Sequence, residues 1–156
     1  MAGTILQDRN EPFVIDFGSG HRVAGTVQVR VMREEIDGTL DFYYHFTVTE
    51  NTALGQCCNR LVVGTGFTGV LTEVEVRTDS LGNTSPLQAS RSADGSEISF
   101  DFSPGLLPAD ESLFFFVRTD AISFKEGDKG SLAQGELSVT QFPVLQPEGE
   151  AASVQP

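Results

Sequence analysis

Two segments of the chain alternate between apolar and polar positions. Between His21 and Arg33 every second position is valine apart from Gly25, and between Thr39 and Thr49 aromatic and aliphatic residues alternate in the same way. A period of two over this length is typical of a β-strand with one face toward a core and the other toward water. The link between the segments contains Asp37-Gly38, which is a strong signal for a β-hairpin.

Shorter segments repeat this pattern along the chain. Strands are predicted at Pro12 to Phe17, Arg60 to Val63, Val70 to Asp79, Glu97 to Phe102, Leu113 to Arg118 and Glu136 to Val144. Residues typical of turns lie between them, and no segment has a helical period. Leu113 to Arg118 contains three consecutive phenylalanines, which indicates burial on both faces. The sequence therefore predicts an all-β fold, an antiparallel two-sheet β-sandwich of eight to nine strands in a Greek-key or jelly-roll-like order.

The remaining segments divide the chain into three parts. Residues 1–11 are polar and are expected to form a flexible N-terminal segment, whereas residues 12–145 form the sandwich, with a charged loop at Glu126 to Gly130. Residues 146–156 are expected to be a disordered acidic tail. No apolar run approaches the roughly 20 residues that span a bilayer, and no signal peptide pattern follows Met1.

Acidic residues dominate the charge of the chain. There are 22 Asp and Glu residues against 10 Lys and Arg, which gives a net charge of −12. A surface of this sign repels the phosphates of nucleic acids and of anionic lipids, so neither is predicted as a partner. The same charge favours solubility and attracts divalent cations.

Acidic turns provide the candidate metal ligands. Calcium binds carboxylate and carbonyl oxygens, and Asp94, Glu97, Asp120 and Asp128 are the residues selected for this role. None of them has the spacing of an EF-hand, and hydrogen bonding within turns is the competing explanation. Calcium is the one candidate cofactor; no other is predicted.

The two cysteines, Cys57 and Cys58, are adjacent in the sequence. Neighbouring residues of a strand point to opposite faces, so an ordinary bridge between them is geometrically awkward. Free thiols, a vicinal disulfide and a link to another subunit in an oxidising compartment all remain open. Metal ligation is disfavoured because the chain has two histidines and no second cysteine pair.

No catalytic signature stands out. Gly64 to Gly69 matches G-x-G-x-x-G, but the residues that follow have the period of a strand and not of a helix, so a nucleotide site is not predicted. His45 is a candidate general base, yet it lies on the polar face of a predicted strand and no nucleophile-elbow serine accompanies it. The chain is not predicted to be an enzyme.

Three segments resemble one protein family. Thr39 to Tyr44, Arg91 to Phe102 and Leu107 to Ala121 follow one another in an order similar to the exported β-domains of bacterial proteins that exosortase sorts to the cell surface (PEP-CTERM proteins). The likeness covers about residues 13 to 144, and the family's sorting motif is represented only by Pro147-Glu148. The resemblance implies a secreted or cell-surface protein in the envelope or extracellular matrix of a bacterium that makes exopolysaccharide, with no catalytic residues carried over.

Two functions are consistent with these patterns. The first is a structural subunit that self-associates into an oligomer or filament, when the segment Met1 to Phe17 pairs with a neighbouring copy. Its assembly surface would comprise Phe13, Ile15, Phe17, Phe114 and Phe116. The alternative is a monomeric module for adhesion or polysaccharide binding, assisted by calcium, that uses the loops at one end of the sandwich. Ordinary core packing is the competing explanation for the phenylalanines.

Overall fold

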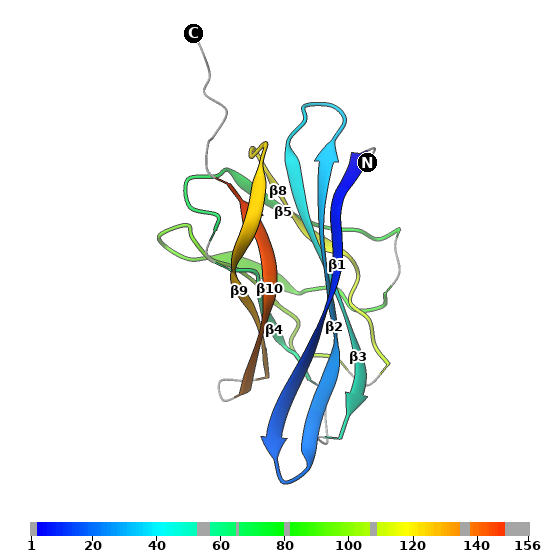
Figure 1. Ribbon diagram of the computed structural model, residues 1–156. Helices are drawn as coiled ribbons and strands as arrows, with labels where there is room; N and C mark the ends of the chain where they lie inside the picture. Colours follow the sequence, from blue (N-terminus) through cyan, green and yellow to red (C-terminus); the bar gives the residue numbers. More distant parts are fainter. Residues whose placement is uncertain are drawn as a thin grey trace.

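The computed structural model describes residues 3–52, 57–64, 66–79, 82–106, 109–134 and 138–148. These residues form ten β-strands in two five-stranded antiparallel sheets that pack as a sandwich (Figure 1). The predicted all-β, antiparallel sandwich is therefore confirmed, with ten strands in place of eight to nine. No helix in the described part of the chain is long and apolar enough to cross a membrane.

The first sheet has the order β1-β2-β3-β8-β5 and the second has the order β10-β9-β4-β7-β6. In the first sheet the strands are β1 Gly3–Gly18, β2 His21–Glu34, β3 Leu40–Asn51, β8 Phe115–Thr119 and β5 Thr72–Val76. In the second they are β10 Ser138–Pro147, β9 Phe124–Gln134, β4 Arg60–Val62, β7 Ile98–Asp101 and β6 Gln88–Arg91. The chain changes sheet after β3, β4, β5, β7 and β8, so strands distant in sequence become neighbours, as Greek-key and jelly-roll orders require.

The N-terminal strand is longer than the sequence predicted. β1 pairs with β2 along its whole length, so the expectation of a flexible segment over residues 1–11 is wrong for Gly3–Glu11. Polar pairs hold this part of the strand in place, since Arg30 of β2 donates hydrogen bonds to the Asp8 carboxylate at 2.8 and 3.1 Å. Cross-strand ion pairs therefore stabilise this part of β1, which lacks the alternation of apolar residues on which the strand prediction was based.

The segment Glu126 to Gly130, expected as a charged loop, belongs to β9. Its glycines interrupt the apolar–polar alternation by which a strand is recognised in the sequence. They are needed because each leaves room for a side chain of β10. A Cβ atom on Gly130 would lie 2.6 Å from Val144 Cγ1 and 2.9 Å from the Phe142 ring. Glycine in a strand often marks such a close approach.

The C-terminal strand also extends beyond its expected end. Gln146 and Pro147, the first residues of the expected acidic tail, belong to β10, and residues 149–156 lie outside the described residues. β6 was not predicted because its four residues, Gln88–Arg91, are mostly polar and exposed.

The main core lies between the two sheets. It takes alternate residues of β3, together with phenylalanines of β7 and β8 and the segments beside them; among its members are Leu40, Phe42, Tyr44, Phe46, Val48, Phe100, Phe102 and Phe115. A second, smaller cluster on the outer face of the first sheet consists of Tyr43, Phe114 and Phe116, with Met32 packed against it. The predicted burial of both faces around Leu113 to Arg118 is therefore confirmed.

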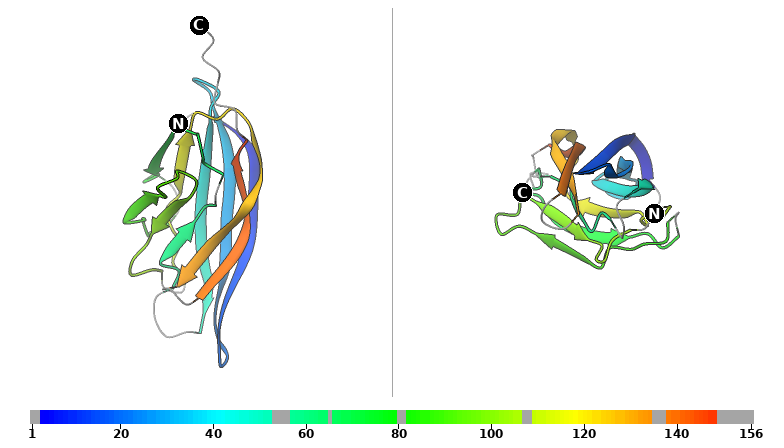
Figure 2. Two further views of the ribbon diagram at one scale, coloured as in Figure 1. Left: turned by 90° about the vertical axis from the view of Figure 1, so that its left-hand side faces the viewer. Right: turned by 90° about the horizontal axis from the view of Figure 1, so that it is seen from below.

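The two lateral sides of the sandwich differ (Figure 2). On one side the long hairpins β1–β2 and β9–β10 lie together, and Arg9 donates two hydrogen bonds to the Glu126 carboxylate at 2.7 and 3.1 Å. On the other side are the short edge strands β5 and β6, which the Arg91 guanidinium joins by donating to Thr72 Oγ1 at 3.1 Å and to the Phe67 carbonyl at 2.6 Å. The first side is closed by long strands, and the second is comparatively open.

Candidate functional site

The four candidate calcium ligands do not form one site. Asp94 accepts hydrogen bonds from Ser92 and Ser96 within its own turn, which lowers its pKa to about 2. Glu97 lies 3.7 Å from the Arg60 guanidinium, Asp120 directly follows β8, and Asp128 lies on β9. Among the described residues, no three His, Cys, Asp or Glu side chains come together as a metal-binding group.

The expected assembly surface is mostly buried. Phe13 and Ile15 are each 2 % exposed and belong to the main core, whereas Phe114 and Phe116 lie in the smaller aromatic cluster. Phe17 alone is on the surface. Core packing therefore explains four of these five residues, and β1 is already paired within its own chain.

The adjacent cysteines are joined to each other. Cys57 and Cys58 form a vicinal disulfide, and both residues are buried. Cys57 also exchanges two backbone hydrogen bonds with Leu106, at 2.7 and 2.6 Å. The structure thus selects the vicinal disulfide from the interpretations left open by the sequence and places it inside the fold.

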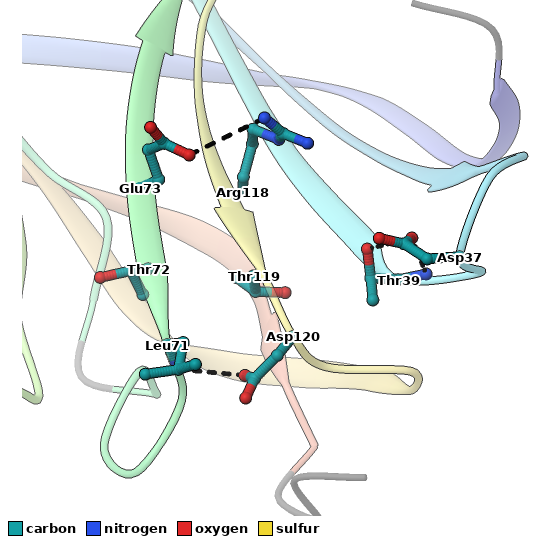
Figure 3. A pocket seen from close by; sticks show the side chains of 8 residues that line it. All are labelled: Asp37, Thr39, Leu71, Thr72, Glu73, Arg118, Thr119 and Asp120. Carbon is teal, nitrogen blue, oxygen red and sulfur yellow. Dashed lines mark hydrogen bonds and ion pairs between the residues drawn. The ribbon is translucent and has the colours of Figure 1, made fainter.

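One pocket of about 270 Å³ lies at the end of the first sheet, beside β5 and β8 (Figure 3). Its polar side chains interact with their own neighbours. Arg118 approaches Glu73 at 3.8 Å, Asp120 accepts a hydrogen bond from the Leu71 amide at 3.0 Å, and Asp37 is bonded to Thr39. These contacts stabilise turns and a strand pair, so the pocket is explained by the local structure.

A larger cavity, of about 370 Å³, lies on the outer face of the first sheet. Three threonine hydroxyls, two carboxamides and one imidazole line it, and we call this set the polar groove; its residues are Asn10, Thr26, Gln28, His45, Thr47 and Thr49. None of the six carries a full charge at neutral pH when the histidine is neutral. The groove therefore offers both hydrogen-bond donors and acceptors without a net charge.

Strand register brings these residues together. Gln28 of β2 lies opposite both Asn10 of β1 and His45 of β3, and Thr26 lies opposite Thr47. Alternate residues of a strand share a face, so the neighbouring pairs form two rows across the same surface. Three long strands fix the rows, which makes the polar groove part of a rigid sheet face and independent of loops.

The His45 ring is held on two sides. It stacks on the Phe114 ring with centroids 4.7 Å apart, and its Nε2 atom lies 3.7 Å from the Glu111 carboxylate. Burial lowers the pKa of His45, and the Glu111 carboxylate opposes this shift. The imidazole is therefore neutral at pH 7, and one of its nitrogens donates while the other accepts.

Charged side chains at the rim neutralise one another. Asp8 accepts hydrogen bonds from Gln28 at 2.8 Å and from Arg30 at 2.8 Å, and the Arg30 guanidinium also lies 5.1 Å from the centre of the Phe114 ring. The ion pair fixes the Gln28 carboxamide beside the cavity. The Asp8–Arg30 ion pair thus orients a groove side chain and adds no net charge.

Further along the same face lies a buried carboxyl group. Asp41 is 1 % exposed, and its pKa is raised to about 7, chiefly because burial disfavours the charged form and also because Glu34 lies nearby. The Arg118 guanidinium opposes the shift. A carboxyl group that is half protonated near neutral pH is unusual and marks this face as more than an inert surface.

The sequence contained part of this site. The register of the hairpin around Asp37-Gly38 brings Gln28 opposite His45, and counting outward from that turn would have found the pair. Asn10 lies in the segment expected to be flexible, so no pattern indicated that it shares the face. The sequence pattern places His45 on the polar face of a strand, whereas the structure buries it to 8 % exposure.

Comparisons with protein-family models, with curated proteins and with solved structures found no match to this chain.

Proposed function

We propose that this protein is a non-catalytic, secreted or cell-surface β-sandwich that binds a neutral polysaccharide in the polar groove. The observation that carries the proposal is the lining of the cavity by hydroxyl, carboxamide and neutral imidazole groups. Saccharides present hydroxyl groups that donate and accept at the same time, and a lining of this kind complements them.

Charge supports a neutral ligand. The chain carries a net charge of −12, so an anionic polysaccharide would be repelled at long range. No charged residue lines the polar groove in the described part of the chain, so a cationic ligand has no ion-pair partner there. For the same reason calcium, which needs carboxylate or carbonyl oxygens, is not part of the proposal.

The geometry of the groove supports an extended ligand. The cavity spans side chains of three adjacent antiparallel strands, β1, β2 and β3, and it is open on the sheet face. The aromatic ring that stacks on His45, Phe114, is 8 % exposed, so binding would depend on hydrogen bonds more than on ring stacking. A face of this kind favours modest affinity and repeated contacts along a chain.

The proposed location has two supports. The resemblance to exported β-domains implies export, and the Cys57–Cys58 disulfide is a bond that persists mainly in oxidising environments.

Affinity electrophoresis in gels that contain neutral or anionic polysaccharides tests the proposal. We expect a neutral polysaccharide to retard the protein and an anionic one to leave its mobility unchanged. Thr47→Val and Asn10→Ala remove groove hydrogen bonds and should each weaken the affinity by about fivefold, since one net hydrogen bond contributes about 1 kcal/mol.

The matched control is Thr140→Val, which changes a half-buried threonine of β10 in the other sheet. This variant should bind like the unmodified protein. Equal weakening by Thr140→Val and Thr47→Val, or no retardation by any neutral polysaccharide, would overturn the proposal.

A further inference from the structure

The sandwich has four edge strands, and three of them carry features that discourage pairing with another chain. β1 has register shifts near both ends, between Ile5 and Gln7 and between Asp16 and Gly18. β10 contains Pro143 and Pro147, which lack backbone donors. Bulges and prolines are common means by which proteins protect sheet edges.

The third protected edge is β5, which carries Glu73 and Glu75. If two copies of β5 paired antiparallel about Val74, Glu73 of one copy would lie opposite Glu75 of the other. Like charges directly opposite each other destabilise a strand pair. This edge therefore opposes self-pairing.

β6 is the exception among the four. Its pairing with β7 is regular from Gln88 to Arg91, and it contains neither proline nor an acidic residue. The surrounding segment Thr84 to Ala93 contains no acidic residue either, in a chain with a net charge of −12. Two copies repel each other over most of their surface, but this repulsion is weakest where the acidic residues are missing.

An apolar cleft lies beside β6 on the open side of the sandwich. Two adjoining cavities of about 260 and 170 Å³ share Val74 of β5 and Ala89 of β6. Leu87, directly before β6, lines one of these cavities and is 73 % exposed. Exposed apolar side chains beside an unpaired strand edge are the features that strand addition covers.

We propose that two copies of this chain associate through an antiparallel β6–β6 pair, which joins their second sheets across a two-fold axis. In this arrangement Ser90 lies opposite Ser90 of the second copy, and Ala89 lies opposite its Arg91, so no like charges meet. Leu87 of each copy becomes buried at the junction. The contact is self-complementary and closes at a dimer.

The dimer would place two polar grooves on one particle. β6 belongs to the second sheet and the groove to the first, so the two surfaces do not compete. If the groove binds polysaccharide, the dimer would bridge two segments of polymer and bind more tightly than one groove alone. The association itself does not depend on that ligand.

Sedimentation equilibrium from micromolar to millimolar concentration tests the association. The mass should rise with concentration from 16.8 kDa to twice that value and no further. Leu87→Glu should weaken the dimer by about tenfold or more, because it places a charge at the junction. Leu71→Glu is the matched control, since Leu71 is also 73 % exposed but lies outside the contact, and it should leave the dimer unchanged.

A second measurement is independent of dimer stability. Ser90→Cys places a thiol next to the two-fold axis and should yield a disulfide-linked dimer on mild oxidation, whereas Val14→Cys, on the exposed face of β1, should not. A constant mass of 16.8 kDa, equal effects of the two leucine variants, or equal cross-linking of the two cysteine variants would overturn the proposal. Polysaccharide binding that survives in a strictly monomeric protein would leave the proposed function intact.

Discussion

The two faces of β3 differ in kind, although most residues of both are buried. The inner face carries Phe42, Tyr44 and Phe46, which contact the phenylalanines of the opposite sheet and of β8. The outer face carries Asp41, Tyr43, His45 and the threonines of the polar groove. One strand therefore supplies the centre of the core and the centre of the candidate site.

The contrast between the two faces separates residues that stabilise the fold from residues that do not. An apolar side chain on the inner face contributes to folding through burial. A buried carboxyl group or imidazole on the outer face costs free energy whenever it must be charged. Asp41 and His45 are therefore poorly explained by folding alone, which agrees with the assignment of function to the outer face from the lining of the polar groove.

The largest effect is expected from the inner face. Phe46→Ala should lower the free energy of unfolding by about 3–5 kcal/mol, because a buried aromatic side chain leaves a cavity in the core. Thr47→Ala, one residue away on the outer face, should change it by at most about 0.5 kcal/mol. Denaturant titration of both variants checks this contrast, which fails if their losses are similar.

The next largest effect on the free energy of unfolding is expected for Asp41, where the substitution should stabilise the protein. Its folded pKa of about 7 lies above the unfolded value of about 3.9, so the folded state binds more protons between these values. Stability due to this group is therefore present at low pH and is lost as the pH rises toward 7. Asp41→Asn should unfold at higher denaturant than the unmodified protein at pH 8, by up to about 4 kcal/mol, and with little difference at pH 4.

Asp37→Asn is the control for this pH dependence. Asp37 is exposed, and hydrogen bonds from Thr39 lower its pKa, so its contribution to stability is present at neutral pH and is lost in acid. The substitution should therefore destabilise the protein at pH 8. A stabilisation by both variants, or by neither, would contradict the assignment of the shift to the burial of Asp41.

A smaller effect is expected for His45. Burial lowers its pKa in the folded state, so the unfolded chain binds a proton more readily below the unfolded value of about 6.5. Stability from this group is present at higher pH and falls as the solution is acidified. His45→Gln should lose less stability than the unmodified protein between pH 7 and pH 5, as measured by thermal unfolding; an identical loss would mean that His45 is charged in the folded state.

The smallest effect is expected from a hydroxyl on the inner face. The Tyr44 hydroxyl is fully buried and has no hydrogen-bond partner among the described residues. Tyr44→Phe removes this uncompensated group and should leave stability unchanged or raise it by about 1 kcal/mol. A loss of more than about 1 kcal/mol in denaturant titration would show that the hydroxyl is hydrogen-bonded.

Periodicity predicted the inner face of the fold well and its edges poorly. The alternation in β2 and β3 was sufficient to predict the central hairpin, because burial on one face imposes a period of two. β1 was missed over Gly3–Glu11, where ion pairs replace apolar contacts, and β9 was missed because Gly127 and Gly130 make room for β10. In each case the residues that hold the strand in place belong to a neighbouring strand, and the pattern within one strand does not reveal them.

The candidate site was harder to predict than the fold. Threonine, glutamine and histidine at alternate positions look like an ordinary solvated face, and only the register of three strands shows that they line one cavity. The disulfide was also left open, since adjacent cysteines in an unknown compartment fit several chemistries.

Amide chemical-shift mapping during titration with a neutral oligosaccharide tests the assignment of function to the outer face most directly. We predict that the largest shifts occur at Asn10, Thr26, Gln28 and Thr47, with little change in β6 or in the loop between β2 and β3. Shifts centred on those other regions, or no shift with any neutral oligosaccharide, would contradict the account.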